Sequence, residues 1–177
     1  TLIKAYGITL FVTVVGTAVS LLITAMLGYM LSQEGLPFGK LLNFLLIFTM
    51  LFNGGLVPTY LVYTTMFHIK DTLFALLIPN LLLNAFNVIL VKNYFKFSLP
   101  AELFESARMD GAGEFQVLRV IVLPLSKPIL ATTGLMTAIS YWNDWQNGMY
   151  YLNDTKLYSI QNILNAINTS VQFLATN

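Results

Sequence analysis

Charged side chains gather in one stretch of this 177-residue chain, between residues 101 and 127. Acids and bases are mixed along it, at Glu102, Glu105, Arg108, Asp110, Glu114, Arg119 and Lys127. Charged groups of both signs on a protein surface are suited to steering and orienting a complementary partner. Because apolar runs flank the stretch on both sides, the pattern predicts a docking surface for a soluble protein, placed between membrane spans.

The first part of this stretch has the start and stop signals of a short helix. Pro100 suits the first turn, and Glu102 and Glu105 complement the positive end of the helix dipole. Gly111, after Asp110, can take the left-handed conformation that ends one helix and lets another begin at a new angle. We therefore expect a helix that ends at a glycine hinge. Simple helix capping by Gly111 is compatible with that role.

A second helix is expected to follow the hinge. Pro124 and Pro128 are expected to stop it before the next apolar run. Four apolar residues of the two helices are left to pack: Leu103, Phe104, Phe115 and Leu118.

Six residues of this element recur at the spacing of a known signature. They are Glu105, Ala107, Gly111, Ile121, Leu123 and Pro124. The spacing resembles the EAA loop of ABC-importer permeases, the membrane subunits that are fed by a solute-binding protein. Asp110-Gly111-Ala112 and Leu123-Pro124-Leu125-Ser126-Lys127-Pro128 also fit the longer family pattern. Ser106 replaces the usual second Ala, a small-for-small change. An ordinary amphipathic hairpin explains the helices but not the spacing.

The resemblance implies an inner-membrane permease subunit whose cytoplasmic coupling loop, residues 93–127, contacts an ATPase. The residues it implies for this contact are Glu102, Glu105, Ala107, Arg108, Asp110, Gly111, Ala112, Phe115, Leu123 and Pro124. Glu105 is the candidate for a charged contact with a basic residue of the ATPase. The implied partners are two ATP-binding cassette subunits, a second permease subunit (a different chain or a second copy of the same one), and an extracellular or periplasmic solute-binding protein.

Composition places the chain in a membrane. It is 56% hydrophobic and 10% charged, and its mean hydropathy is +0.71. Soluble domains carry about 25% charged residues. The net charge of +1 gives no reason to expect nucleic-acid binding, and the absence of cysteine excludes disulfides, thiolate metal sites and a cysteine nucleophile.

Four apolar runs predict four transmembrane helices in one all-α permease domain, residues 1–177. They cover Tyr6 to Leu31, Lys40 to about Phe52, Thr72 to about Lys92, and Ile129 to about Tyr141. Small residues along the first run favour close helix packing on one side. The resembled family implies six spans in a full subunit, so we expect one more at each end.

Polar residues interrupt the second and third runs. Asn53-Gly54-Gly55 falls near mid-membrane, where a broken helix is tolerated against protein or a water-filled cavity. It is either a kink that lines a solute pathway or a packing kink. Asn80, Asn84 and Asn87 are spaced to share one face of a third helix. Asn84 and Asn87 there either contact solute or bond neighbouring helices.

Aromatic residues frame a polar pair after the fourth run, in Trp142-Asn143-Asp144-Trp145. One interpretation is an aromatic belt at the membrane interface. Another is a sugar site, with rings for pyranose faces and polar groups for hydroxyls. This segment and Gly54 to Tyr60 also resemble permeases for oligosaccharides or polysaccharides. Permeases for peptides, amino acids or polyamines are the alternative within the family.

Basic residues predict the orientation. Lys40, Lys92, Lys96, Arg108, Arg119 and Lys127 flank one side, and Lys4, Lys70 and Lys156 flank the other. The positive-inside rule puts the larger set in the cytoplasm of a bacterial or archaeal cell.

The chain has no Gly-rich phosphate loop, so it is expected to bind no cofactor, and ATP and Mg belong to partner subunits. His68 has no partner for catalysis or metal binding and is interpreted as a loop residue. A membrane enzyme and a structural or signalling membrane domain are the rival classes. The first lacks a nucleophile–base pair, and the second needs no such loop spacing.

Overall fold

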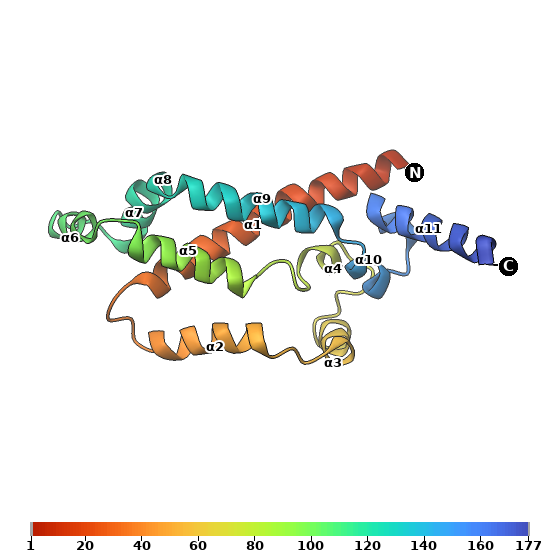
Figure 1. Ribbon diagram of the computed structural model, residues 1–177, viewed down its shortest axis with the longest axis horizontal. Helices are drawn as coiled ribbons and strands as arrows, with labels where there is room; N and C mark the ends of the chain where they lie inside the picture. Colours follow the sequence, from red (N-terminus) through yellow and green to blue (C-terminus); the bar gives the residue numbers. More distant parts are fainter. Residues whose placement is uncertain (1, 177) are drawn as a thin grey trace. The chain divides into compact units, whose positions relative to one another are not determined.

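The computed structural model describes residues 2–176, and all of its regular elements are helices. The longer helices are α1 (Leu2–Ser32), α2 (Gly39–Leu51), α5 (Ala85–Phe97), α6 (Ala101–Met109), α9 (Lys127–Asn143) and α11 (Ile160–Thr176). The shorter ones are α3 (Leu56–Leu61), α4 (Phe74–Leu77), α7 (Glu114–Val117), α8 (Leu123–Leu125), α10 (Gln146–Tyr151) and the 3-10 turn η3 (Thr155–Leu157). Two π-helical segments, η1 (Val62–Met66) and η2 (Leu118–Val122), continue α3 and α7. The predicted all-α class is confirmed (Figure 1).

The first predicted span is confirmed as α1, whose 31 residues are long and apolar enough to cross a membrane. Two of its glycines, Gly16 and Gly28, approach other helices closely. At Gly16 an added Cβ would lie 2.5 Å from Cζ of the Tyr141 ring. At Gly28 it would lie 3.0 Å from the Val91 side chain. The small residues of α1 therefore serve packing, as the sequence indicated.

The second and fourth predicted spans are each one part of a bent pair of helices. α2 is followed, after a break at residues 52–55, by α3 and η1, and the run Glu114–Leu125 meets α9 at 83°. Counting each pair as one span, up to three of the described segments could cross a membrane by length and composition.

The third predicted span, Thr72 to Lys92, is wrong as a single helix. The chain forms α4, leaves the helical conformation after Leu77, and restarts at α5. Pro79 has no N–H to donate, and Asn80 has a left-handed φ of 62°. Together these residues break the helix that hydropathy alone predicted.

The described chain forms two compact units, each with its own apolar core. One contains Ser20–Asn53 and Leu83–Leu135, with a core that includes Tyr29, Val91, Phe95 and Val122. The other contains the chain up to Val19, Gly54–Leu82 and the chain from Met136, with a core that includes Tyr141 and Tyr151. The single permease domain stays a prediction.

Candidate coupling element and polar sites

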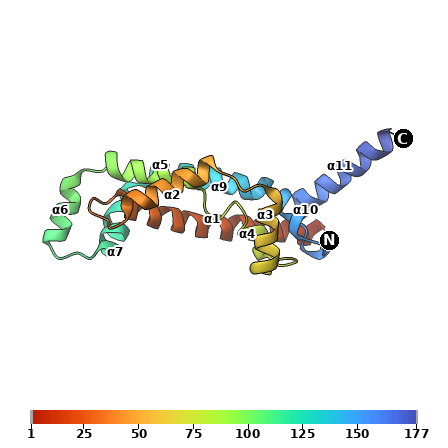
Figure 2. The same cartoon turned by 90° about the horizontal axis from the view of Figure 1, so that it is seen from below.

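The helix α6 forms where the sequence placed it. Pro100 precedes it in an extended conformation, Glu102 lies in its first turn and Arg108 in its last, so both charges complement the helix dipole. Phe104 and Ala107, three residues apart, are buried in the core of their unit, while Glu105 on the other face is exposed. Within this unit α6 stands beyond the end of α5 (Figure 2).

The left-handed turn predicted at Gly111 is confirmed and is a Schellman turn. Gly111 has a φ of 81°, its N–H donates to the carbonyl of Arg108 at 3.0 Å, and the N–H of Ala112 donates to that of Ala107 at 3.0 Å. This pair of bonds caps the carbonyls at the end of α6. Because the left-handed conformation disfavours a Cβ, the turn explains the need for glycine here.

The second helix of the element runs past its expected stop. α7, η2 and α8 are consecutive from Glu114 to Leu125, and Pro124 lies inside α8. A proline ring would clash with the carbonyl four residues earlier in a regular α-helix, and here a π-helical turn precedes it. The direction changes only at Ser126, and Pro128 lies in the first turn of α9.

The element presents more apolar surface than expected. Phe104 and Leu118 pack in the core as predicted, but Leu103 is 40% and Phe115 is 67% exposed. Met109, which the sequence did not single out, is 88% exposed. Glu102 and Asp110 are also exposed. Exposed acids and exposed large apolar side chains thus both occur along α6, the turn and α7.

A polar network that sequence reasoning missed joins the element to α1. Glu114 accepts hydrogen bonds from Nε of Arg108 at 2.9 Å, from Nη2 of Arg108 at 3.4 Å and from the Tyr29 hydroxyl. The guanidinium of Arg108 also donates to Gln33. Arg108 was a predicted site residue, whereas Tyr29, Gln33 and Glu114 were not. No spacing rule links residues so distant in the chain.

The Asn53-Gly54-Gly55 break is confirmed as a non-helical segment. All three residues are exposed, and Gly55 has a φ of 90°. A Cβ at Gly54 would meet no atom within 4 Å. Within the described chain the break is therefore not set by a helix that crosses closely at Gly54.

The prediction that Asn80, Asn84 and Asn87 share a helical face is wrong. Asn80 lies in a turn, and Asn84 is the residue that caps α5. The Asn84 side chain accepts a hydrogen bond from the backbone N–H of Asn87 at 3.2 Å, which is the usual role of Asn at a helix start. Asn87 itself is buried. The three asparagines would share one face of a continuous helix, but α5 begins only at Ala85, after Asn80 and Asn84.

The polar groups of the Trp142–Trp145 segment are engaged locally. Nδ2 of Asn143 donates to the carbonyl of Ile139 at 3.0 Å. Oδ1 of Asp144 accepts from the N–H of Asn147 at 3.2 Å, at the start of α10. The carbonyl of Trp145 accepts from Asn162 at 2.6 Å. The chain turns here from α9 into α10, and both tryptophans border that turn.

Two further residues fix this turn and escaped sequence reasoning. The Tyr141 hydroxyl donates to the carbonyl of Leu77 at 2.7 Å, and Nδ2 of the buried Asn147 donates to that of Pro79 at 2.9 Å. They satisfy carbonyls that the broken helix at 78–84 leaves without intrahelical partners.

An exposed carboxylate in the turn at residues 67–73, which follows η1, holds the segment after α10. Asp71 accepts hydrogen bonds from the backbone N–H of Asn153, from that of Asp154 at 3.1 Å and from Nδ2 of Asn153 at 3.2 Å. The two backbone bonds hold the pKa of Asp71 below its usual value. His68, in the same turn, is exposed with a φ of 51°. Within residues 2–176 no group of three or more His, Cys, Asp or Glu could hold a metal ion.

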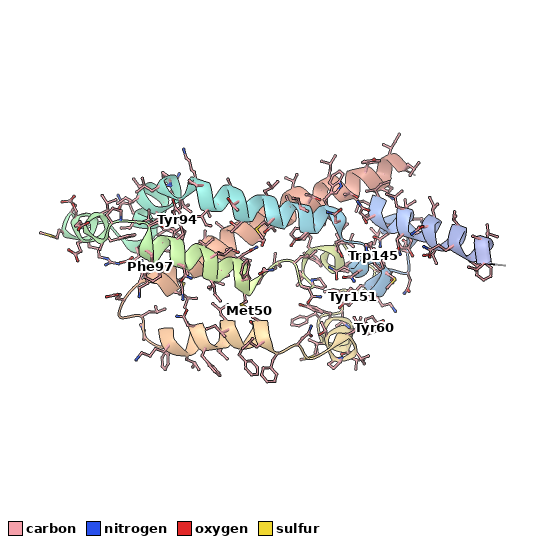
Figure 3. All side chains as sticks on the ribbon, in the orientation of Figure 1. Met50, Tyr60, Tyr94, Phe97, Trp145 and Tyr151 are labelled. Carbon is pink, nitrogen blue, oxygen red and sulfur yellow. The ribbon has the colours of Figure 1, made fainter. Side chains whose placement is uncertain are left out.

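Three tyrosine rings from α3, η1 and α10 form an aromatic cluster in the same unit. The Tyr60 and Tyr151 rings stack with centroids 5.6 Å apart, and Tyr63 meets Tyr151 edge-on at 6.0 Å (Figure 3). An adjoining groove of about 690 Å³ is lined mainly by apolar side chains of α3, η1 and the segment to Ile78. Because these rings already stack on one another, they contribute to the packing of this unit and do not offer free ring faces to a sugar.

The family model described as "Binding-protein-dependent transport system inner membrane component" matches residues 3–145. Protein LplC of Bacillus subtilis is 42% identical over all of this chain, which covers 59% of that protein. The polygalacturonan/rhamnogalacturonan transport system permease protein YtcP of the same organism is 42% identical over 93% of this chain, covering 56% of YtcP.

A solved structure is also similar. It is the crystal structure of a bacterial ABC transporter involved in the import of the acidic polysaccharide alginate, matched with a TM-score of 0.87 and 36% identity over 93% of this chain and 58% of that one. The chain thus spans somewhat over half the length of these proteins.

Proposed function

The chain belongs to the family of binding-protein-dependent transport system inner membrane components. We propose that it forms part of the permease subunit of an ATP-driven importer. The observation that carries this proposal is the element α6–Gly111–α7. Its Schellman turn lies at the glycine of the EAA spacing, and both acids and large apolar side chains of the element are exposed.

The solvent-facing surface of this element has the composition of a protein interface. Methionine and aromatic residues are enriched in interface cores, while charged residues lie at the rim. Met109 and Phe115 would fill a cleft of the ATP-binding subunit, and Glu102, Glu105 and Asp110 would meet basic residues around it. Closure of two such subunits on ATP and Mg would then move the attached helices and open the pathway to a solute-binding protein.

The distribution of basic residues supports a cytoplasmic coupling element in a multi-pass membrane protein. All six residues of the larger basic set lie in the unit formed by Ser20–Asn53 and Leu83–Leu135, and the other three lie in the second unit. The positive-inside rule assigns the first unit to the cytoplasmic side. The cell membrane of a bacterium or archaeon is the corresponding location.

A polysaccharide or oligosaccharide is the proposed cargo. The support is the similarity to proteins whose names specify polygalacturonan/rhamnogalacturonan or alginate transport. Asn53, Gly54, Gly55, Asn84, Asn87 and the Trp142–Trp145 segment stay the pathway candidates, with a sister permease forming the other wall. Asn53 is the best placed of them, because it is exposed in a non-helical break and could present polar groups to hydroxyls.

The test is to purify the full-length protein from its native host through an affinity tag. Recovery of an ATP-binding cassette subunit, and stimulation of ATPase activity by a solute-binding protein loaded with an acidic oligosaccharide, is the expected result. A membrane enzyme or structural domain would retain no such subunit. Stimulation only by peptide- or amino-acid-loaded binding proteins would keep the permease and refute the carbohydrate cargo.

A further inference from the structure

Glu114 is the centre of a hydrogen-bonded network that connects three helices of one unit. Its carboxylate is held by Arg108 from α6 and by Tyr29 from α1, and Arg108 also reaches Gln33 just beyond α1. Glu114 itself is the first residue of α7. One carboxylate therefore ties both halves of the coupling element to the end of the first span.

The two glycines of the turn between the halves lie in open space, and backbone hydrogen bonds close the turn itself. A Cβ at Gly111 or Gly113 would meet no atom within 4 Å, whereas Ala112 between them packs against the apolar core of the unit. The Arg108–Glu114 ion pair bridges the turn from one side to the other. Hydrogen bonds to a carboxylate are directional, whereas the apolar contacts of Phe104 and Leu118 are not. The network thus adds directional bonds to the Schellman turn and the apolar core that hold α7 against α6.

The α1 end of the network is firmly held. The Tyr29 ring is buried in the same apolar core as Val91 and Phe95 of α5. Next to it, Gly28 brings α1 close to α5, with an added Cβ only 3.2 Å from the Lys92 backbone nitrogen. Because the ring cannot easily shift while its hydroxyl bonds Glu114, movement of the element must reach α1.

From this geometry we propose that Glu114 and Tyr29 are positioning residues that transmit displacement of the coupling element to α1. The proposal rests on the proposed function. It assigns to Glu114, with Arg108 and Tyr29, the role of a mechanical link. Without this link the ATPase subunits would still bind and hydrolyse ATP, but their closure would move α1 less effectively.

The experiment uses the complete transporter in proteoliposomes and measures solute taken up per ATP hydrolysed in the same vesicles. Tyr29→Phe removes the hydroxyl donor and Glu114→Gln removes the charge of the acceptor, both while preserving size. Both should lower this ratio, by up to about tenfold if the full value of a charge-assisted hydrogen bond is lost. Their effects should not add in the double variant, because both act on the same bond. The swapped pair Arg108→Glu/Glu114→Arg should recover part of the ratio lost in Glu114→Arg alone.

Two matched variants in the same unit provide controls. Tyr94→Phe removes a hydroxyl with one long bond, 3.5 Å to the carbonyl of Leu125, and Glu34→Gln breaks an exposed ion pair with Lys96 at 3.6 Å. Both should keep the wild-type ratio. If Tyr29→Phe and Glu114→Gln match these controls, the link is refuted. A wild-type protein that assembles with no ATPase refutes the proposed function instead, and the wild-type sample alone reveals it.

Discussion

The aromatic ring of Tyr141 in α9 lies directly over Gly16 in α1, where it occupies the space that any Cβ would need. The same tyrosine donates its hydroxyl to the carbonyl of Leu77, so it joins α1, α9 and the end of α4 in one unit. Close approach of a glycine and a large ring replaces, in lipid, the packing that the hydrophobic effect drives in water.

Replacing Gly16 with Leu should therefore destabilise the folded protein. Overpacking a tight contact costs about 1–3 kcal/mol, and the Tyr141 hydroxyl bond would be strained as well. Gly7→Leu on the same helix is the matched control, because a Cβ there meets no atom within 4 Å. The melting temperature in detergent should fall for Gly16→Leu only. Equal melting temperatures would mean that the ring moves aside at no cost.

Replacing Gly111 with Val should impair coupling while the protein still reaches the membrane. A β-branched residue at a φ of 81° is strained by about 1–2 kcal/mol, and relief of that strain would rotate α7 against α6. Gly113→Val, two residues away at a φ of −73° and in equally open space, lacks this strain. Uptake normalised to protein amount should drop in Gly111→Val and much less in Gly113→Val. Normal uptake by Gly111→Val would refute the hinge.

Local rules predicted the coupling element because its signals are local. The left-handed conformation that ends α6 favours glycine, which the sequence has at position 111. Glu102 and Arg108 lie in the first and last turns of that helix, where their charges complement the helix dipole. The Tyr29–Glu114 bond joins residues 85 positions apart and needs the tertiary fold. The third span failed for a related reason. Hydropathy reads Thr72 to Lys92 as one run, whereas Pro79, Asn80 and the Asn84 cap end one helix and begin another.

Protonating or neutralising Asp71 should release the segment that follows α10. The pKa of Asp71 is lower in the folded protein than the usual carboxyl pKa of about 3.9. Above that usual pKa the hydrogen bonds of Asp71 therefore stabilise the folded protein fully, and this stabilisation is lost as the pH falls through the lower pKa of the folded state. Exchange protection of the Asn153 and Asp154 amides should thus persist from pH 7 to about pH 5 and fail only below the usual value. Asp71→Asn should weaken the protection at every pH.

Asp154→Asn is the control for this experiment. The Asp154 carboxylate accepts from the N–H of Lys156 at 2.9 Å, a bond within the segment itself. If Asp71→Asn exchanges no faster than Asp154→Asn, the carboxylate does not hold the segment.

Alanine substitutions at Asn53, Trp142, Asn143 and Asp144 should separate pathway residues from structural ones. A glycan leaving water needs replacement hydrogen bonds, so loss of a pathway residue should lower uptake per molecule and leave basal ATPase activity intact. The local bonds of Asn143 and Asp144 predict a different result for these two, namely reduced expression, because they fix the turn into α10. Uptake normalised to protein amount distinguishes the outcomes. Normal uptake per molecule in all four variants would remove both segments from the pathway.

The central claim, that α6 and α7 dock onto an ATP-binding subunit, is tested most directly by site-specific photocrosslinking in the native membrane. A photoreactive phenylalanine analogue at Phe115, which is 67% exposed on the coupling element, should crosslink to that subunit. The same analogue at Phe44, which is 61% exposed on α2, should not. Absence of a crosslink from position 115, or an equal yield from position 44, would contradict the account.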